Sequence, residues 1–156
     1  MKPSAPLEDA LRGRLIVVCG PGGVGKTTTA AALALSAARS GRRTLVCTID
    51  PSKRLRTSLG LARLTGAPQP VLKNLSAMRL DAKRTFDDLV RRHAADAAAR
   101  ERVLQNRFYQ QISRHLAGTH EVMAMEALMG VAGDFDLVVL DTPPPSSALA
   151  FLVALY

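Results

Sequence analysis

Ten residues near the N-terminus combine glycines with a lysine and threonines at the spacing of a phosphate-binding loop. The stretch GPGGVGKTTT, residues 20–29, matches the pattern G-x-x-x-x-G-K-[ST]. Glycine reaches the backbone angles that turn N–H groups toward a polyphosphate, and it leaves room for the ligand. We therefore predict that this loop, known as Walker A, binds a nucleotide through Gly20, Gly22, Gly23, Val24, Gly25, Lys26, Thr27 and Thr28.

The end of the motif supplies a charge and a metal ligand. Lys26 has the length to reach the β- and γ-phosphates, and the hydroxyl of Thr27 is suited to bind Mg²⁺. A helix that begins near Lys26 would also direct the positive end of its dipole at the same anion. These features predict a nucleoside triphosphate bound with Mg²⁺.

Two aspartates end apolar segments farther along the chain. Asp141 ends LVVLD, where P-loop enzymes hold the acid that orients Mg²⁺ through water, and we favour this interpretation over a turn residue. Asp50 ends a second apolar segment, on the sheet edge expected to carry the loop, where it would position the attacking water. From spacing alone, a cap for the segment that starts at Pro51 is an equally weighted alternative for Asp50.

Short apolar runs and a glycine-terminated helix should position these residues. Buried strands are predicted at residues 14–19, 43–50 and 136–141, with a further short strand at 75–80. Residues 28–40 are strong helix formers and stop at Gly41, a typical C-terminal cap. Strand, loop, helix and strand in this order form a βαβ unit with parallel strands. Residues 66–70, GAPQP, indicate a loop.

The pattern turns helical from about residue 81 to residue 133. A capping box is predicted at Thr85 and Asp88, with one helix face formed by Phe86, Leu89, Val90 and His93. A second helix is predicted from the spacing of Leu104, Phe108, Ile112, His115 and Leu116, and it should end at Gly118. A third should start at Thr119 and pack Val122, Met125 and Met129 into the core.

Composition limits the class of protein. The chain has 156 residues, 47% of them hydrophobic, which suffices for one globular domain. The net charge of +8 permits an anionic ligand or partner without specifying one. Cys19 and Cys47 lie in apolar runs and are expected to be core residues, and the scattered histidines suggest no metal site. The longest apolar run, ALAFLVALY, is too short to cross a bilayer, and no secretory signal is visible, so we expect a soluble, cytoplasmic protein.

With these motifs assembled, the sequence resembles the ArsA/Get family, which are dimeric P-loop ATPases. The family includes arsenite-pump ATPases and the ATPases that deliver tail-anchored membrane proteins. GPGGVGKTT looks like its P-loop, TIDPSKRL (48–55) like its first switch, and DTPPPSSALAFL (141–152) like its second switch. The segments between the switches resemble a bacterial branch described as anion-transporting ATPases.

The resemblance implies an α/β P-loop NTPase with a mostly parallel central sheet and a helical insertion, about residues 81–133, between the two switch regions. We expect residues 1–13 to be a flexible leader and residues 14–156 to be the ATPase domain. The resemblance further implies hydrolysis of Mg-ATP to ADP and phosphate as a conformational switch. In this scheme Lys26 and Asp50 are catalytic, Asp50 polarises the attacking water, and Thr27 holds Mg²⁺ with Asp50 and Asp141 acting through water.

The family also implies partners. We expect a homodimer, or pairing with a related ATPase subunit, and a membrane-protein client or membrane partner; nucleic acid is not favoured. The alternatives are a ParA/MinD-like positioning ATPase on DNA or membrane, a small-molecule kinase, and a truncated nucleotide-binding remnant without turnover.

Two features depart from the family pattern. The family's P-loop commonly has a lysine after its first glycine, which reaches the partner's nucleotide, and here Pro21 supplies neither charge nor N–H. The family also continues well beyond its second switch, so we expect this chain to be the N-terminal part of a larger protein or a truncated gene product, and its ATPase domain to be incomplete. The basic cluster of Lys53, Arg54 and Arg56 is interpreted either as a solvated face or as charge near the phosphates.

Overall fold

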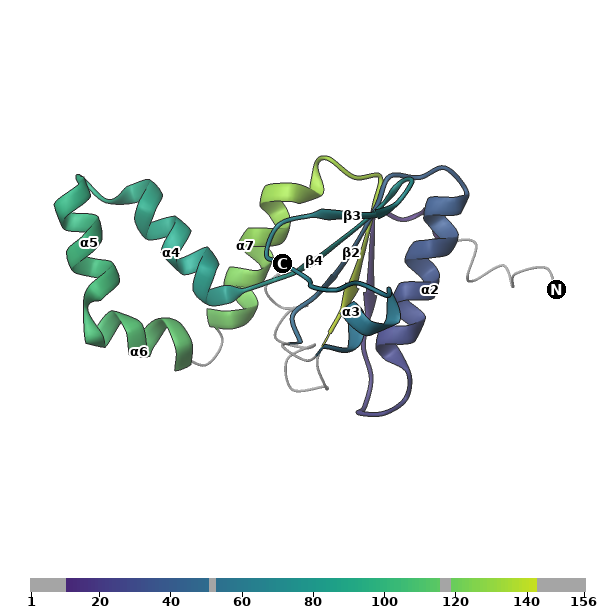
Figure 1. The fold of residues 1–156 in the computed structure, drawn as a ribbon, viewed down its shortest axis with the longest axis horizontal. Helices are drawn as coiled ribbons and strands as arrows, with labels where there is room; N and C mark the ends of the chain where they lie inside the picture. The colour runs from purple at the N-terminus through teal and green to yellow at the C-terminus, as the bar shows by residue number, and fades with distance from the viewer. Residues whose placement is uncertain (1–10, 51–52, 116–118, 143–156) are drawn as a thin grey trace.

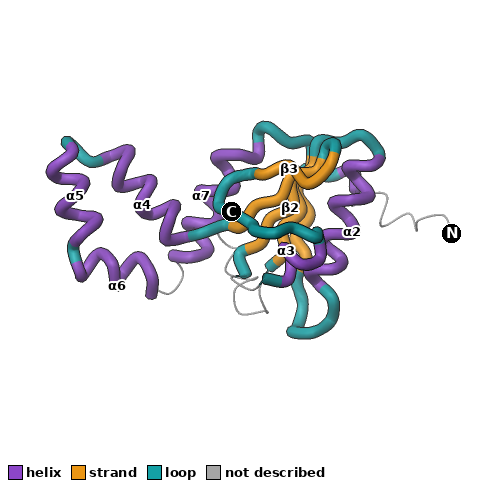
Figure 2. Tube along the Cα trace, in the orientation of Figure 1, coloured by secondary structure: helices purple, strands orange, loops and turns teal. Residues whose placement is uncertain are grey.

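A five-stranded sheet with helices on both faces forms the body of the protein (Figures 1 and 2). The computed structural model describes residues 11–50, 53–115 and 119–142. The strands have the order β1-β5-β2-β4-β3, and all neighbours are parallel except β3, which is antiparallel to β4. Their bounds are β1 Leu15–Val18, β2 Thr44–Thr48, β3 Gln69–Leu72, β4 Leu75–Arg79 and β5 Leu137–Asp141. The helices are α2 Lys26–Arg39, α3 Arg54–Ser58, α4 Ala82–His93, α5 Ala97–Gln105, α6 Arg107–His115 and α7 Thr119–Ala132.

This architecture confirms the predicted α/β class with a mostly parallel sheet. β1 and β2 are parallel as expected, but β5 lies between them and pairs with both. β3 was not predicted, and it starts inside the segment interpreted as a loop. The βαβ pattern fixes the direction of two strands, whereas their separation by a strand from near the end of the chain is set by tertiary contacts.

The two faces of the sheet bury different residues of the same strand. On β2, Val46 belongs to the core beneath α2, whereas Leu45 and Cys47 belong to the core beneath α7. This alternation is the two-residue period of a strand. Helices cover both faces of the sheet, and its central strands β2 and β5 are buried along their whole length. Burial raises the pKa of the Cys47 thiol, and the nearby Asp141 carboxylate raises it further. The prediction of a core cysteine is confirmed for Cys47.

β1 is less buried than predicted. It pairs only with β5 among the described residues, and Leu15 is 36% exposed. Cys19, which follows β1, is exposed, so its assignment to the core was wrong. An apolar run indicates a strand, but whether the strand lies at the centre or the edge of a sheet depends on residues far away in sequence.

Helix α2 packs against the sheet through small side chains. Its buried residues are all alanines: Ala30, Ala31, Ala34, Ala37 and Ala38. The helix ends with the C-terminal cap that Gly41 predicts. Gly41 has φ +95°, its N–H donates to the carbonyl of Ala38, and the N–H of Arg42 donates to the carbonyl of Ala37. These two bonds form a Schellman motif, which satisfies carbonyls at the helix end.

The residues before β1 contact this helix end. The carbonyls of Leu11 and Gly13, within the proposed leader, accept hydrogen bonds from the guanidinium of Arg42. Leu11 also packs against the core beneath α2. The rest of that segment, residues 1–10, lies outside the described residues.

The helical segment between the switches divides into two parts (Figure 1). α4, α5 and α6 extend away from the sheet, whereas α7 returns to cover one of its faces. Asp81 caps α4 by accepting the N–H of Arg84, while Thr85 lies inside the helix and donates to the carbonyl of Asp81. The predicted capping box at Thr85 was therefore wrong.

The second predicted helix is two helices. α5 ends at Gln105, and the side chain of Asn106 accepts the N–H groups of Phe108 and Tyr109 at the start of α6. Asparagine competes with helical hydrogen bonding and favours helix starts, which explains the break. Leu104 and Phe108 thus lie on different helices.

The face that α7 buries agrees with the prediction only in part, since Met125 alone of the three predicted residues packs against the core beneath α7. Ala124 and Leu128 are buried against the sheet, whereas Val122 is 50% exposed and Met129 is 68% exposed. Both stripes have helical spacing, so periodicity alone did not distinguish them. None of the helices in the described residues has the length and hydrophobicity needed to cross a membrane.

Candidate functional site

The glycine-rich loop connects β1 to α2 and has the backbone that its composition predicts. Gly23 and Gly25 have φ values of +81° and +89°, in the left-handed region that side chains disfavour. Gly25 is the N-cap residue of α2, so Lys26 and Thr27 form the first turn of the helix. The ammonium of Lys26 donates a 2.8 Å hydrogen bond to the carbonyl of Pro21, across the loop.

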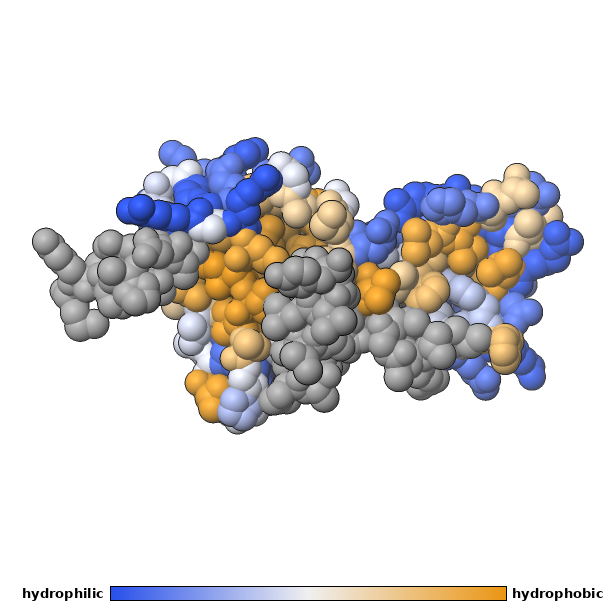
Figure 3. Space-filling model, turned by 180° about the vertical axis from the view of Figure 1, so that it is seen from behind, coloured by the Kyte–Doolittle hydropathy of each residue, from blue (hydrophilic) through white to orange (hydrophobic). Residues whose placement is uncertain are grey.

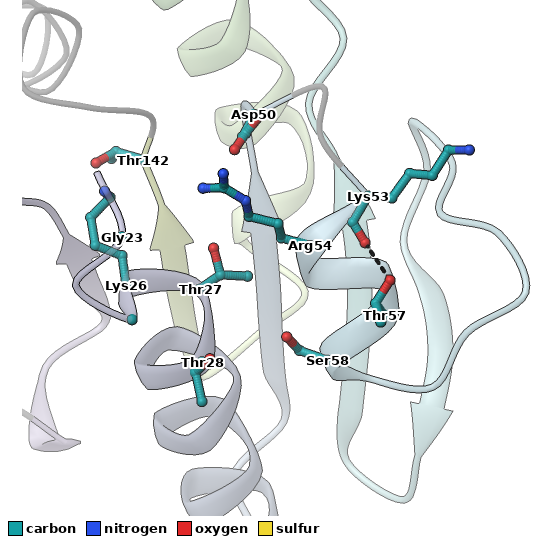
Figure 4. A pocket seen from close by; sticks show the side chains of 11 residues that line it. Gly23, Lys26, Thr27, Thr28, Asp50, Lys53, Arg54, Thr57, Ser58 and Thr142 are labelled. Atoms are coloured by element: carbon teal, nitrogen blue, oxygen red, sulfur yellow. Dashed lines mark hydrogen bonds between the residues drawn. The ribbon is translucent and has the colours of Figure 1, made fainter. Parts of the chain in front are cut away.

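A cavity of about 510 Å³ opens beside this loop (Figure 4). It lies at the carboxyl ends of the parallel strands, between the start of α2 and α3, where ligands of open α/β sheets bind. The lining residues are Gly23, Gly25, Lys26, Thr27, Thr28, Asp50, Lys53, Arg54, Thr57, Ser58 and Thr142. Gly20, Gly22 and Val24 belong to the same loop but do not line the cavity.

Asp141 adjoins the cavity through Thr27. The Thr27 hydroxyl donates a 2.8 Å hydrogen bond to Oδ2 of Asp141, and the Thr48 hydroxyl donates to the same oxygen at 3.3 Å. Asp141 is 1% exposed, and burial raises the pKa of its carboxyl above the ordinary value. The two hydroxyls oppose this shift, and the charge of Asp50 reinforces it.

The donor set fits Mg²⁺. Oδ1 of Asp141 is buried and has no hydrogen-bond partner among the described residues, although a buried carboxylate oxygen normally needs one. Carboxylate and hydroxyl oxygens are ligands that Mg²⁺ prefers, directly or through its waters. Thr27 and Asp141 would therefore hold the ion. No group of three or more His, Cys, Asp or Glu in the described residues forms another metal site.

Asp50 reaches the same cavity from the end of β2. It follows the strand by two residues, and its N–H donates to the Thr48 hydroxyl at 3.1 Å. The alternative role as a cap concerned the segment that starts at Pro51, and residues 51 and 52 lie outside the described residues. The N-cap residue of the next helix, α3, is Lys53.

The sequence patterns did not identify four hydroxyl residues at the site: Thr57 and Ser58 of α3, which line the cavity, and Thr48 and Thr142. Thr48 joins Asp50 to Asp141 through its hydroxyl, and Thr142 lines the cavity while donating to the carbonyl of Val18 at 3.0 Å. Each lies next to or near an aspartate at a strand end. That pattern, a hydroxyl beside an acid at the carboxyl edge, would have been the signal.

Comparisons with known proteins agree on one family. A family model described as anion-transporting ATPase matches residues 13–155. An uncharacterized protein of Streptomyces coelicolor is 40% identical and covers 90% of this chain, which spans 37% of that relative. An ATPase GET3 of Pyricularia oryzae is 33% identical over 97% of the chain and 46% of the relative. An ATPase ASNA1 homologue of Paramecium tetraurelia is 32% identical over 88% of the chain and 42% of the relative. The chain thus spans less than half the length of these relatives.

Proposed function

The chain belongs to the anion-transporting ATPase family, and we propose that it binds Mg-ATP and hydrolyses it to ADP and phosphate as a conformational switch. The observation that carries this proposal is one cavity lined by Lys26, Thr27 and Asp50, which come from two separate segments. A cation, a hydroxyl and a carboxylate at one phosphate-binding loop are the groups that phosphoryl transfer requires.

Binding begins with the loop and the first turn of α2. Their backbone N–H groups and the helix dipole favour a polyphosphate. Lys26 exchanges its hydrogen bond with the Pro21 carbonyl for the β- and γ-phosphate oxygens, because a charge-assisted bond to an anion is the stronger one. Thr27 and Asp141 would hold Mg²⁺, which would supply positive charge to offset that of the phosphates.

Asp50 orients the water that attacks the γ-phosphate. Its carboxylate accepts a hydrogen bond from that water, and Thr48 holds the backbone of Asp50 beside Asp141. Asp50 belongs to the first switch segment, so loss of the γ-phosphate removes a contact from that segment. Such order–disorder changes on hydrolysis are a recurring basis of nucleotide switches.

The test is phosphate release from ATP in the presence of Mg²⁺ and no other acceptor. We expect release by the wild type, abolished by EDTA and by Lys26→Ala, with ATP binding by calorimetry also lost in Lys26→Ala. Lys73→Ala is the matched control, because Lys73 is an exposed lysine in the turn between β3 and β4. ATP binding without phosphate release would identify a nucleotide-binding module instead, and release that requires an added hydroxyl acceptor would identify a kinase.

We also propose a homodimer, or pairing with a related ATPase subunit, and a membrane-protein client or membrane partner. Family membership supports this part of the proposal. Light scattering of the chain with and without a non-hydrolysable ATP analogue in Mg²⁺ tests the pairing. A monomer mass in both conditions contradicts a homodimer.

A further inference from the structure

Arg54 lines the cavity from outside the phosphate-binding loop, and the proposed function gives it no role. It is the first residue of α3, it is exposed, and it lines the cavity. Its guanidinium points from α3 toward the phosphate-binding loop, between Asp50 and Thr27 in the view of Figure 4. Within the part of the chain that the structure describes, the guanidinium makes no hydrogen bond or ion pair.

The other two cations of the basic cluster are directed elsewhere. Arg56 is half-buried and donates from its guanidinium to the carbonyl of Ala62 at 2.7 Å, which holds the loop after α3. The side chain of Lys53 points away from the phosphate-binding loop (Figure 4). Arg54 is therefore the member of this cluster whose charge is available to a ligand in the cavity.

The phosphate-binding loop contains one cationic side chain. Lys26 is its only lysine, and Pro21 carries neither charge nor N–H. Charge on a transferring phosphoryl group spreads over three oxygens, and a planar guanidinium can donate to two of them at once. An arginine that faces the loop from α3 meets this need without help from another subunit.

We propose that Arg54 binds the γ-phosphate of ATP in its own subunit and stabilises the charge of the transferring phosphoryl group. This inference rests on the proposed ATPase function. Water attacks the γ-phosphorus, the bond from that phosphorus to the β-phosphate oxygen breaks, and ADP, phosphate and a proton leave. Arg54 keeps its proton throughout and acts by hydrogen bonding alone.

The binding test needs no turnover. Calorimetry with Mg²⁺ compares a non-hydrolysable ATP analogue with ADP, in the wild type, Arg54→Ala, Arg54→Lys and the control Arg63→Ala. Arg63 is an exposed arginine outside the cavity, so its removal matches the change in net charge. Arg54→Ala should lower the affinity for the analogue by about 10-fold or more, because a charged hydrogen bond to the γ-phosphate is lost. Its affinity for ADP should stay within about 2-fold of the wild-type value. Arg54→Lys should recover part of the loss.

The kinetic test separates action within a subunit from action across a pair. Phosphate release by Arg54→Ala should fall by about 10³-fold, the lower end of the effect of arginines that stabilise phosphoryl transfer. Mixing Arg54→Ala with Lys26→Ala should restore nothing, since each subunit would lack one of its own groups. Restored activity on mixing would overturn the assignment to the same subunit.

Failure of the two proposals can be told apart. If the wild type releases no phosphate, the ATPase proposal fails, and the calorimetry still decides whether Arg54 contacts the γ-phosphate. If Arg54→Ala binds the analogue and ADP as the wild type does, the Arg54 proposal is overturned whatever the turnover.

Discussion

The hydroxyl of Thr27 donates a 2.8 Å hydrogen bond to the carboxylate of Asp141, although 114 residues separate the two in sequence. The contact exists because β5 pairs directly with β1, the strand that leads into the phosphate-binding loop. Strand pairing therefore places Asp141 beside the loop, where it accepts the hydrogen bond from Thr27.

Thr48 should position Asp50 and Asp141 without touching the nucleotide. Its hydroxyl accepts the N–H of Asp50 and donates to Asp141, and the residue is 1% exposed. Thr48→Val should lower the free energy of unfolding by about 1–2 kcal/mol, because two hydrogen bonds of the buried Thr48 hydroxyl are lost. Turnover should fall by about 5-fold with little change in KM for ATP.

A matched threonine separates stability from catalysis. Thr44 is buried at the opposite end of β2 and donates to the carbonyl of Arg42 at 3.0 Å. Thr44→Val should lower stability in a similar way and leave turnover per folded protein unchanged. Equal losses of turnover in both variants would show that Thr48 acts only through the fold.

Asp50 should contribute to chemistry more than to binding. Asp50→Asn should keep the affinity for Mg-ATP within a few-fold and lower turnover by about 10²-fold or more, as for loss of a water-orienting carboxylate. Calorimetry and phosphate release measure the two effects separately. Asp134→Asn, an exposed aspartate before β5, is the control. Unchanged turnover in Asp50→Asn would favour a structural role for this aspartate.

Pro21 should make hydrolysis independent of a second subunit's phosphate-binding loop. Its ring supplies no charge that could reach a partner's nucleotide. Phosphate release per subunit should stay nearly constant across a wide dilution series of the wild type. The backbone contact to Lys26 does not need a proline, so Pro21→Lys should fold and provides the comparison. A steep loss of wild-type turnover on dilution would show that catalysis needs a dimer.

The ion pair at the start of β5 should stabilise the fold in a pH-dependent way. Asp136 accepts hydrogen bonds from the side chain and N–H of Arg43, which lower the pKa of Asp136 below its ordinary value of 3.8. A carboxyl with a lowered pKa stabilises the folded state above the ordinary value, and this contribution disappears as pH falls through the lowered pKa. The pair is exposed, so its effect is small.

Asp136→Asn should therefore lower Tm by about 2 °C at neutral pH, and the two proteins should converge at pH values below 3.8. Thermal unfolding followed by circular dichroism across pH measures the difference. Asp134→Asn, which removes a nearby charge without these hydrogen bonds, should change Tm less. A Tm difference that persists at acid pH would show that the loss has another cause.

Local sequence determined several elements of this protein. The glycine loop, the capping of α2 by Gly41 and the apolar runs of β2 and β5 could all be predicted, because each depends on neighbouring residues. The positions of Lys26, Thr27 and Asp50 at one sheet edge followed from the parallel βαβ pattern. The resemblance of three ordered motifs to a known ATPase family was also available without a structure.

Tertiary structure decided what depends on distant residues. β5 lies between β1 and β2, which brings Asp141 to Thr27 and leaves β1 and Cys19 more exposed than their composition suggests. More than one apolar stripe of α7 has helical periodicity, so periodicity does not predict which one is buried. In the fold, Ala124 and Leu128 pack against the sheet. Arg54 and Arg56 share charge and sequence neighbourhood, yet the short helix α3 turns one to the cavity and the other to a loop carbonyl. The sequence pattern of a strand does not show which strands pair with it, because pairing and burial depend on residues that are far away in the sequence.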